Sequence, residues 1–255
     1  GLAGDGGDVS GGGIYIAPTS SPTIRNCIVR NCTLIGGTGA DGGDTGFGWG
    51  APGGRGGWAR GGGIYIGADS EAVLEHVTVY GCTATAGDGG SGGSSLLGGD
   101  GGWSGQPQGG GIYCGPNSRP TFIDCEVTDC NVVGGNGGDG GDGSFAYWAG
   151  GFGGSWSEDD EWLRRGALGG GVFCDASSSP TFIGCSINNN TVNSGLTGIG
   201  GFGGSTQAEP TINLDIPSCG GGLYVDANSV VSIADCNVSG NLTVFKNDLY
   251  SGYGG

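Results

Sequence analysis

The composition of this chain narrows both its class and its partners. It has 255 residues, of which 67 are glycine, and its 8 basic and 24 acidic side chains give a formal net charge of −16. A charge of this sign repels phosphate backbones, so we expect no nucleic-acid partner. No apolar run approaches the about 20 residues of a membrane span, so we expect no span. The chain has neither a signal peptide nor a methionine, which leads us to expect a secreted, processed product that acts outside the cell or at its surface.

Five copies of a short motif recur along the chain. The strings GGGIYI, GGGIYI, GGGIYC, GGGVFC and GGGLYV begin at Gly11, Gly61, Gly109, Gly169 and Gly220. A second block follows each string and begins at Ser20, Ser70, Ser118, Ser178 and Ser229. The spacings of 50, 48, 60 and 51 residues differ because the glycine-rich insert after each block varies in length. Repetition at this scale is typical of solenoid proteins.

Within each copy, apolar and polar residues alternate over runs too short to form a sheet alone, but stacked coils let each strand pair with its copy one rung away. We therefore predict an all-β fold, a right-handed parallel β-helix of five rungs that forms a single domain over residues 1–255. The expected inward column is Ile14, Ile64, Ile112, Val172 and Leu223. The expected outward aromatic column, a candidate surface for self-assembly, is Tyr15, Tyr65, Tyr113, Phe173 and Tyr224.

The string GGGIY, followed by PTI or PTF and then by NC or DC with a later Asn, resembles the repeats of right-handed β-helix surface proteins. These include the polymorphic outer-membrane-protein type and the wider pectin-lyase-like superfamily. The resemblance covers the repeated blocks and not the inserts between them. It implies the architecture but leaves the activity open, because that superfamily contains lyases, hydrolases, adhesins and structural proteins.

Four glycine-rich inserts, at about 36–60, 86–108, 134–168 and 194–219, share a three-residue period, as in Gly134, Gly137, Gly140 and Gly143. Three residues per turn is the period of polyproline II, so we predict arms of this conformation packed beside the β-helix. Their XGG triplets resemble the polyglycine II bundles proposed for some bacterial surface proteins. A calcium nonapeptide is an alternative for residues 134–143, although the apolar residue of that motif is missing. We otherwise expect no cofactor.

The ten cysteines fall mostly into columns of the repeat. Cys27, Cys125, Cys185 and Cys236 share one position, with Val77 in the remaining copy. Cys32, Cys82 and Cys130 share another, which Asn190 and Asn241 complete. Because Val or Asn takes the place of Cys in some copies, we expect both columns to hold small residues that face the core of the β-helix. Disulfides across a bend, or between Cys114 and Cys174 of adjacent rungs, are alternatives whose geometry the sequence does not establish.

Two further sets of residues are candidates for function. Asn31, Asn189, Asn237 and Asn241 each begin an N-x-S/T sequon, which predicts either glycosylation or an internal hydrogen-bonding ladder. The tryptophans all lie in the inserts, where they would pack arms together, bind sugar rings or contact another subunit: Trp49, Trp58, Trp103, Trp148, Trp156 and Trp162.

We expect an extracellular structural protein and not an enzyme. The first rung begins after only ten residues, so it lacks the usual polar cap, which favours head-to-tail stacking into a homopolymer or continuation into a longer protein. The alternative is a glycan-binding adhesin or a polysaccharide lyase or hydrolase, with no catalytic or metal-binding residues assigned. An ice-binding face is a third hypothesis, but Val73 and Ser232 interrupt the threonine column of Thr23, Thr121 and Thr181.

Overall fold

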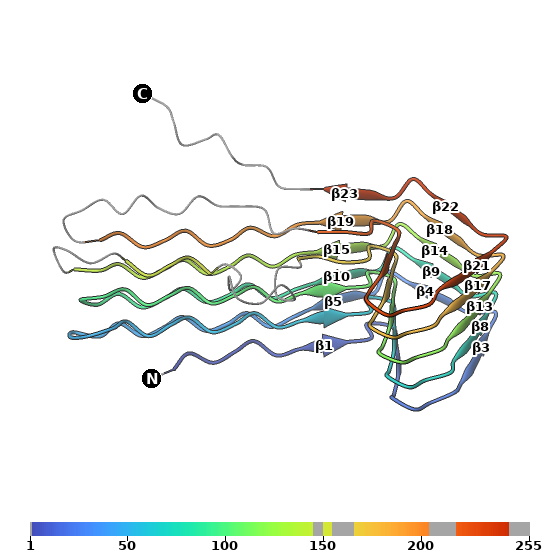
Figure 1. The fold of residues 1–255 in the computed structure, drawn as a ribbon, viewed down its shortest axis with the longest axis horizontal. Helices are drawn as coiled ribbons and strands as arrows, with labels where there is room; N and C mark the ends of the chain where they lie inside the picture. The colour runs from blue at the N-terminus through green and yellow to red at the C-terminus, as the bar shows by residue number, and fades with distance from the viewer. Residues whose placement is uncertain (1, 145–149, 155–165, 204–217, 245–255) are drawn as a thin grey trace, which may run out of the picture.

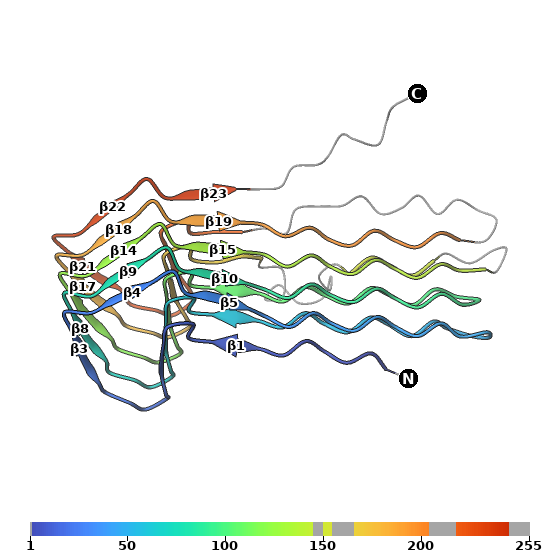
Figure 2. The same cartoon turned by 180° about the vertical axis from the view of Figure 1, so that it is seen from behind.

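The computed structural model describes residues 2–144, 150–154, 166–203 and 218–244. Short strands form four five-stranded sheets and one three-stranded sheet in these ranges. The same ranges contain no helix of the length and apolarity that a membrane span requires. Figures 1 and 2 show a stack of rungs from which long extended arms project to one side. The five-rung parallel β-helix with arms packed alongside, expected from the sequence, is confirmed.

Each rung contributes one three-residue strand to each of four sheets, and equivalent strands of successive rungs pair in parallel and in register. One sheet contains β2 (Ile14–Ile16), β7 (Ile64–Ile66), β12 (Ile112–Cys114), β16 (Val172–Cys174) and β20 (Leu223–Val225). The next contains β3 (Thr23–Arg25), β8 (Val73–Glu75), β13 (Thr121–Ile123), β17 (Thr181–Ile183) and β21 (Ser232–Ala234). The third contains β4 (Ile28–Arg30), β9 (Thr78–Tyr80), β14 (Glu126–Thr128), β18 (Ser186–Asn188) and β22 (Asn237–Ser239). The fourth contains β5 (Thr33–Ile35), β10 (Thr83–Thr85), β15 (Asn131–Val133), β19 (Thr191–Asn193) and β23 (Leu242–Val244). The small sheet contains β1 (Val9–Ser10), β6 (Ala59–Arg60) and β11 (Pro107–Gln108). The first two inserts, expected to end at about residues 60 and 108, therefore end in strands β6 and β11 where they return to the rungs.

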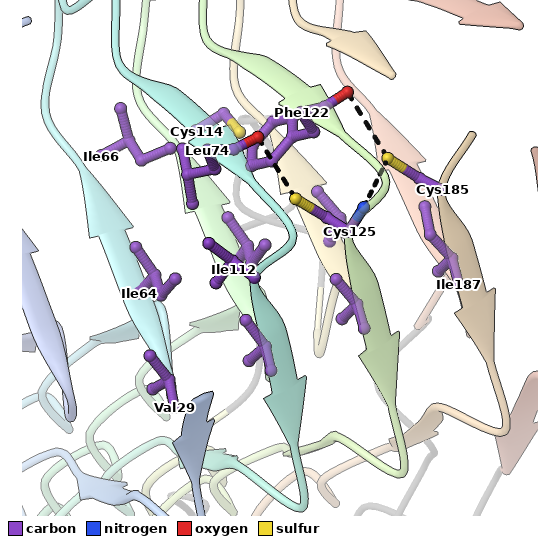
Figure 3. Packing of buried hydrophobic residues seen from close by; sticks show 14 of the residues in the cluster. Val29, Ile64, Ile66, Leu74, Ile112, Cys114, Phe122, Cys125, Cys185 and Ile187 are labelled. Atoms are coloured by element: carbon purple, nitrogen blue, oxygen red, sulfur yellow. Dashed lines mark hydrogen bonds between the residues drawn. The ribbon is translucent and has the colours of Figure 1, made fainter. Parts of the chain in front are cut away.

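Inward residues of the first three sheets form one continuous apolar core (Figure 3). Those of the fourth sheet and the small sheet form a second cluster, which includes Ala59, Ala84 and Val132. Ile64, Ile112 and Val172 of the expected inward column are buried, and the end members Ile14 and Leu223 are partly buried against them. Phe122 and Phe182 stack in the same core with ring centroids 4.6 Å apart. Burying an aliphatic or aromatic side chain contributes about 1.5–3 kcal/mol, so the stacked columns are the main source of stability in the rungs.

The three glycines of each GGG motif have different roles. Gly61 adopts a φ of 69°, which favours glycine. A methyl group on Gly62 would lie 2.3 Å from the carbonyl oxygen of Gly110 in the next rung. One on Gly63 would lie 3.2 Å from Cys82 Sγ. The motif therefore makes a tight corner that lets adjacent rungs and the inward thiol column approach closely.

The arms pack as two layers of extended segments (Figure 1). Residues 36–46, 86–94, 134–143 and 194–203 run outward and form what we call the outgoing layer. The returning layer contains residues 2–8, 49–58, 97–106 and 150–154. Residues 2–8 join this layer through the N–H of Gly6, which donates to Arg55 O at 2.7 Å. The short N-terminal prefix thus packs as one more arm segment.

Hydrogen bonds in the arms follow the three-residue period. The first glycine of a triplet donates within its layer, as Gly39 N–H does to Asp88 O at 2.9 Å. The second donates across the layers, as Gly87 N–H does to Gly57 O at 2.9 Å. Both glycine positions are sterically closed, because a methyl group on Gly87 would lie 1.8 Å from Gly37 O. In the inner arms only the third residue of each triplet has room for a side chain, whereas at the edge the second position is also open, as at Gly43, where nothing lies within 4 Å of an added methyl group.

Candidate functional site

The aromatic column expected on the outside of the rungs is a continuous stack. Neighbouring rings lie 4.9 to 5.5 Å apart and within 5° of parallel. Tyr15, at the first rung, is 56% exposed, whereas Tyr113 is 3% exposed and Phe173 is fully buried against Leu168. The returning segments therefore cover the middle of this column, and only its lower end is open for contact with another molecule. Tyr65 and Tyr224 are partly buried beside the same cluster.

Tyr113 donates a hydrogen bond from its hydroxyl to the carboxylate of Asp175 on the next rung. Desolvation, together with the charge of Asp175, raises the pKa of Tyr113. Burial likewise raises the pKa of Tyr65. Both phenols are held neutral, and that of Tyr113 is a hydrogen-bond donor, which is a structural role.

Three of the six tryptophans fall within the described residues, and Trp148, Trp156 and Trp162 lie outside them. Trp49 is 74% exposed at the tip of the first arm. Trp58 and Trp103 lie on the returning layer, where the guanidinium groups of Arg60 and Arg55 each stack over an indole at 4.3 Å. Arginine therefore occupies one face of each of these two rings.

Acidic residues recur at the third position of the arm triplets, where they bind backbone of the neighbouring arm. Asp41 Oδ1 accepts the N–H of Ser91 at 2.8 Å, and Asp88 Oδ1 accepts that of Asn136 at 2.6 Å. Asp139 and Asp142, within the alternative calcium motif, accept N–H groups of the fourth arm in the same way. These carboxylates satisfy donors that would otherwise rely on water. Sequence reasoning missed this role, although the spacing of Asp after paired glycines was a signal for it.

Groups of three or more His, Cys, Asp or Glu side chains that could hold a metal ion are not found among the described residues. The third repeat carries three exposed acidic residues, Asp124, Glu126 and Asp129, and the two aspartates lie at corners whose φ values are 50° and 52°. His76 lies 3.7 Å from the carboxylate of Asp124, and both side chains are more than half exposed.

The predicted cysteine column packs inward. Cys125 and Cys185 are buried in the core, while Cys27 and Cys236, in the end rungs, are partly buried against it. The N–H of Cys125 donates to Cys185 Sγ at 3.4 Å, and the thiol of Cys125 donates to Leu74 O at 3.3 Å (Figure 3). Val77 fills the remaining place and is 1% exposed. These side chains pack as small core residues.

The sequon asparagines occupy two environments. Asn31 and Asn189 are exposed at corners with φ of 54°, and Asn237 is exposed in β22. Asn241 faces inward, where its Oδ1 accepts the N–H of Asn190 at 2.9 Å and its Nδ2 donates to Ile187 O at 2.8 Å. An internal amide ladder therefore exists at Asn190 and Asn241, whereas glycosylation at the exposed positions stays a prediction.

An apolar hollow of about 350 Å³ opens at the first rung. Inward residues Ile14, Ile16 and Ile24 line it, together with Tyr15 and Pro22. In the inner rungs, the residues equivalent to Ile24 are Leu74, Phe122 and Phe182, all fully or almost fully buried. The first rung therefore presents the lower surface of the core.

The core is more exposed at the opposite end of the β-helix. Ile233 and Val238 hold the inward positions of β21 and β22 in the fifth rung, yet each is 48% exposed. Their equivalents one rung below, Phe182 and Ile187, are 1% and 2% exposed. The column of Ile24 and Ile233 is therefore accessible at both ends, whereas the column of Val238 is closed at the first rung, where Val29 is 6% exposed. The two ends are the best candidate site for contact with another molecule.

No protein-family model matches this chain, and no curated protein matches it either. Among solved structures, the chain is similar to the nine polyproline type II helical bundle antifreeze protein of the springtail Granisotoma rainieri, in which crystal waters match the ice lattice. The two chains are 25% identical, and the match covers 61% of this chain and 82% of the other with a TM-score of 0.21. At this TM-score the likeness carries no conclusion about how this chain works.

Proposed function

We propose that this protein is an extracellular structural subunit that assembles end to end through its β-helix, as a filament or a surface layer. The observation that carries the proposal is that the core column from Ile24 to Ile233 is accessible at both ends of the stack. The repeats that resemble β-helix surface proteins are consistent with this role. The interface is heterologous, so each added copy leaves a new open end and growth continues.

Backbone geometry supports the docking of one copy on the next. Between the first two rungs, Thr78 N–H donates to Cys27 O at 3.0 Å and Thr83 N–H donates to Cys32 O at 2.8 Å. The first-rung equivalents of these donors are the N–H groups of Ile28 and Thr33, on the edge that faces away from the second rung. The fifth-rung equivalents of the acceptors are the carbonyls of Cys236 and Asn241. Stacking the first rung of one copy on the fifth rung of another brings these groups together at the spacing of the inner rungs, about 4.8 Å.

Side chains at the two ends also fit each other. In a stacked pair, Ile24 of one copy would continue the column that ends at Ile233 of the other, and the hollow at Ile14 and Ile16 would be filled. An exposed strand edge beside an open apolar core is a strong template for pairing with another chain.

A charged side chain at the inward position of the first rung tests this proposal. We expect the wild-type protein to form filaments whose length grows with concentration, as seen by electron microscopy and light scattering. Ile24→Lys buries a charge in the junction and should leave folded single subunits. Ile28→Lys is the matched control, because Ile28 lies on the same rung but is 71% exposed and faces outward. Single subunits of the wild type at every concentration, or equal assembly of both variants, would overturn the proposal.

A second candidate function is binding of a glycan at the tip of the first arm. Trp49 is 74% and Phe47 89% exposed there, and flat aromatic faces of this kind stack on sugar rings. A glycan array probed with the wild type and with Trp49→Ala separates this function from assembly, because the arm tip lies away from the rung ends. Loss of glycan binding without loss of filaments would assign the two functions to separate sites.

A further inference from the structure

The strongest feature that the proposed function leaves unused is a row of three thiols inside the β-helix. Cys32, Cys82 and Cys130 occupy the same position in the first three rungs, just before the paired residues Thr33, Thr83 and Asn131. The thiols of Cys82 and Cys130 donate to the carbonyl oxygens of Val29 and Val79 in the rung below, at 3.8 Å and 3.7 Å. We call these three residues the thiol column.

Exposure differs along the thiol column. Cys82 and Cys130 are 0% and 1% exposed, but Cys32 is only partly buried, because no described rung covers it from below. A small oxidant therefore has a route to Cys32 and none to the two inner sulfurs. The glycines that face the column, Gly13 and Gly63, leave space beside the sulfurs that any larger residue would fill.

The spacing along the thiol column is compatible with covalent pairing. Adjacent parallel strands lie about 4.8 Å apart, and disulfides join residues whose Cα atoms are about 4.4 to 6.8 Å apart. In-register side chains point the same way, so rotation of the side-chain torsions is the movement that brings sulfurs of adjacent rungs into bonding distance. The two possible bridges, Cys32 to Cys82 and Cys82 to Cys130, share Cys82 and exclude each other.

We propose that the thiol column is a redox site, in which a peroxide oxidises Cys32 and the resulting disulfide joins adjacent rungs through Cys82. In the first step the thiolate of Cys32 attacks the peroxide, the O–O bond breaks, and a sulfenic acid and one water form. In the second step the thiolate of Cys82 attacks the sulfur of Cys32, the S–O bond breaks, and a second water leaves. Two thiols and one hydrogen peroxide thus give one disulfide and two waters.

The third thiol allows the bridge to move inward. The thiolate of Cys130 can attack Cys82, form a bond between them, and release Cys32 as a thiol that takes up the proton lost by Cys130. Interaction with the flanking thiols, Cys130 first, lowers the pKa of Cys82, which favours the thiolate that attacks the sulfur of Cys32 in the second step above. The same interaction raises the pKa of Cys130, so the thiol of Cys130 is the less reactive of the two.

The neighbouring cysteine column supplies a matched control within the chain. Cys27 is partly buried in the same rung as Cys32, but Val77 takes the place of a thiol above it. Cys27 should therefore react with peroxide without forming a bridge. Cys114 and Cys174 pair in register but are both fully buried, so they should stay reduced.

The experiment treats folded single subunits with hydrogen peroxide at a concentration below that of assembly, because a stacked copy would cover Cys32. The remaining thiols are then blocked with iodoacetamide, and the non-reduced peptides are mapped by mass spectrometry. We expect Cys82 linked to Cys32 or to Cys130, with only the first link in Cys130→Ala and neither in Cys82→Ala. Val77→Cys should create a new bridge to Cys27. The oxidised protein should melt on the order of 10 °C higher than the reduced protein, because the bridge closes a loop of one repeat.

Several outcomes would overturn the proposal. Recovery of Cys32 and Cys82 as separate blocked or over-oxidised residues would show that the sulfurs do not pair. Bridges that involve the exposed Cys219 as often as the thiol column would indicate random pairing. An unchanged pattern in Cys82→Ala would assign the bridge to other residues. The wild-type peptide map decides the question even where a variant fails to fold.

Discussion

Replacing Gly90 by alanine tests the steric rule on which the arms are built. The new methyl group would lie 2.0 Å from Ala40 O and 2.4 Å from Ala40 C in the neighbouring arm. Ordinary carbon to oxygen contacts are about 3.4 Å, so the two segments must separate by about 1.4 Å. The N–H of Gly90 donates across the layers to Gly54 O at 2.9 Å, and that hydrogen bond would lengthen or break.

The expected cost follows from these contacts. Overpacking costs about 1–3 kcal/mol and each lost hydrogen bond about 1 kcal/mol, so Gly90→Ala should lower the free energy of unfolding by about 3 kcal/mol. Gly43→Ala is the control, because nothing lies within 4 Å of its added methyl group. It should change stability by less than about 1 kcal/mol and in the favourable direction. Gly90 and Ala40 hold equivalent positions in the second and first arms of the outgoing layer. The first arm is the edge of that layer, and there the chain already carries alanine.

Urea unfolding and hydrogen exchange of the arm amides measure the two effects separately. Gly90→Ala should speed exchange at Gly90 and its neighbours in the second arm, while the rung amides stay protected until global unfolding. Equal unfolding free energies for Gly90→Ala and Gly43→Ala, with unchanged exchange, would show that glycine is not required at the closed positions and would refute the reasoning.

Two further predictions concern single side chains. Asp88→Ala removes the acceptor of the Asn136 N–H and should lower the free energy of unfolding by about 1 kcal/mol. Asp88→Asn keeps a side-chain oxygen and should retain most of that stability. Urea unfolding of the two variants measures the difference, and equal losses of stability would contradict the role of Asp88 as a backbone acceptor. The raised pKa of Tyr113 means that its stabilisation is complete below the unfolded-state value of about 10 and is lost as pH rises above it. Unfolding free energy should therefore fall above that pH less steeply in Tyr113→Phe than in the wild type, and parallel curves would refute the linkage.

The repeat makes the rungs predictable from sequence. Equivalent residues of a solenoid must stack, so an alignment of the GGG strings is enough to place Ile64 inward and Tyr65 outward. The three-residue period of glycine likewise predicts the arms, because polyproline II places every third residue on the same side and the 3₁₀-helix, which has the same period, is rarely longer than about four residues.

Contacts between the arms and the rungs are not predictable in the same way. The burial of Tyr113 and Phe173 depends on where the returning segments cross the aromatic stack, and Leu168, which covers them, lies outside the repeated blocks. The capping by Asp41 and Asp88 depends on the offset between neighbouring arms. Insert length and composition do not determine that offset; backbone hydrogen bonds across two layers do.

The most direct measurement of the central claim is cryo-electron microscopy of the assembled protein. End-to-end stacking through the β-helix predicts filaments in which the strands repeat every ~4.8 Å along the axis. The subunits should repeat every ~24 Å, which is the height of five rungs. Density for the first rung should continue the columns of the fifth rung of the next subunit. Two results would contradict the account. One is filaments joined through the arms, with a gap between successive β-helices. The other is particles that remain single subunits at all concentrations.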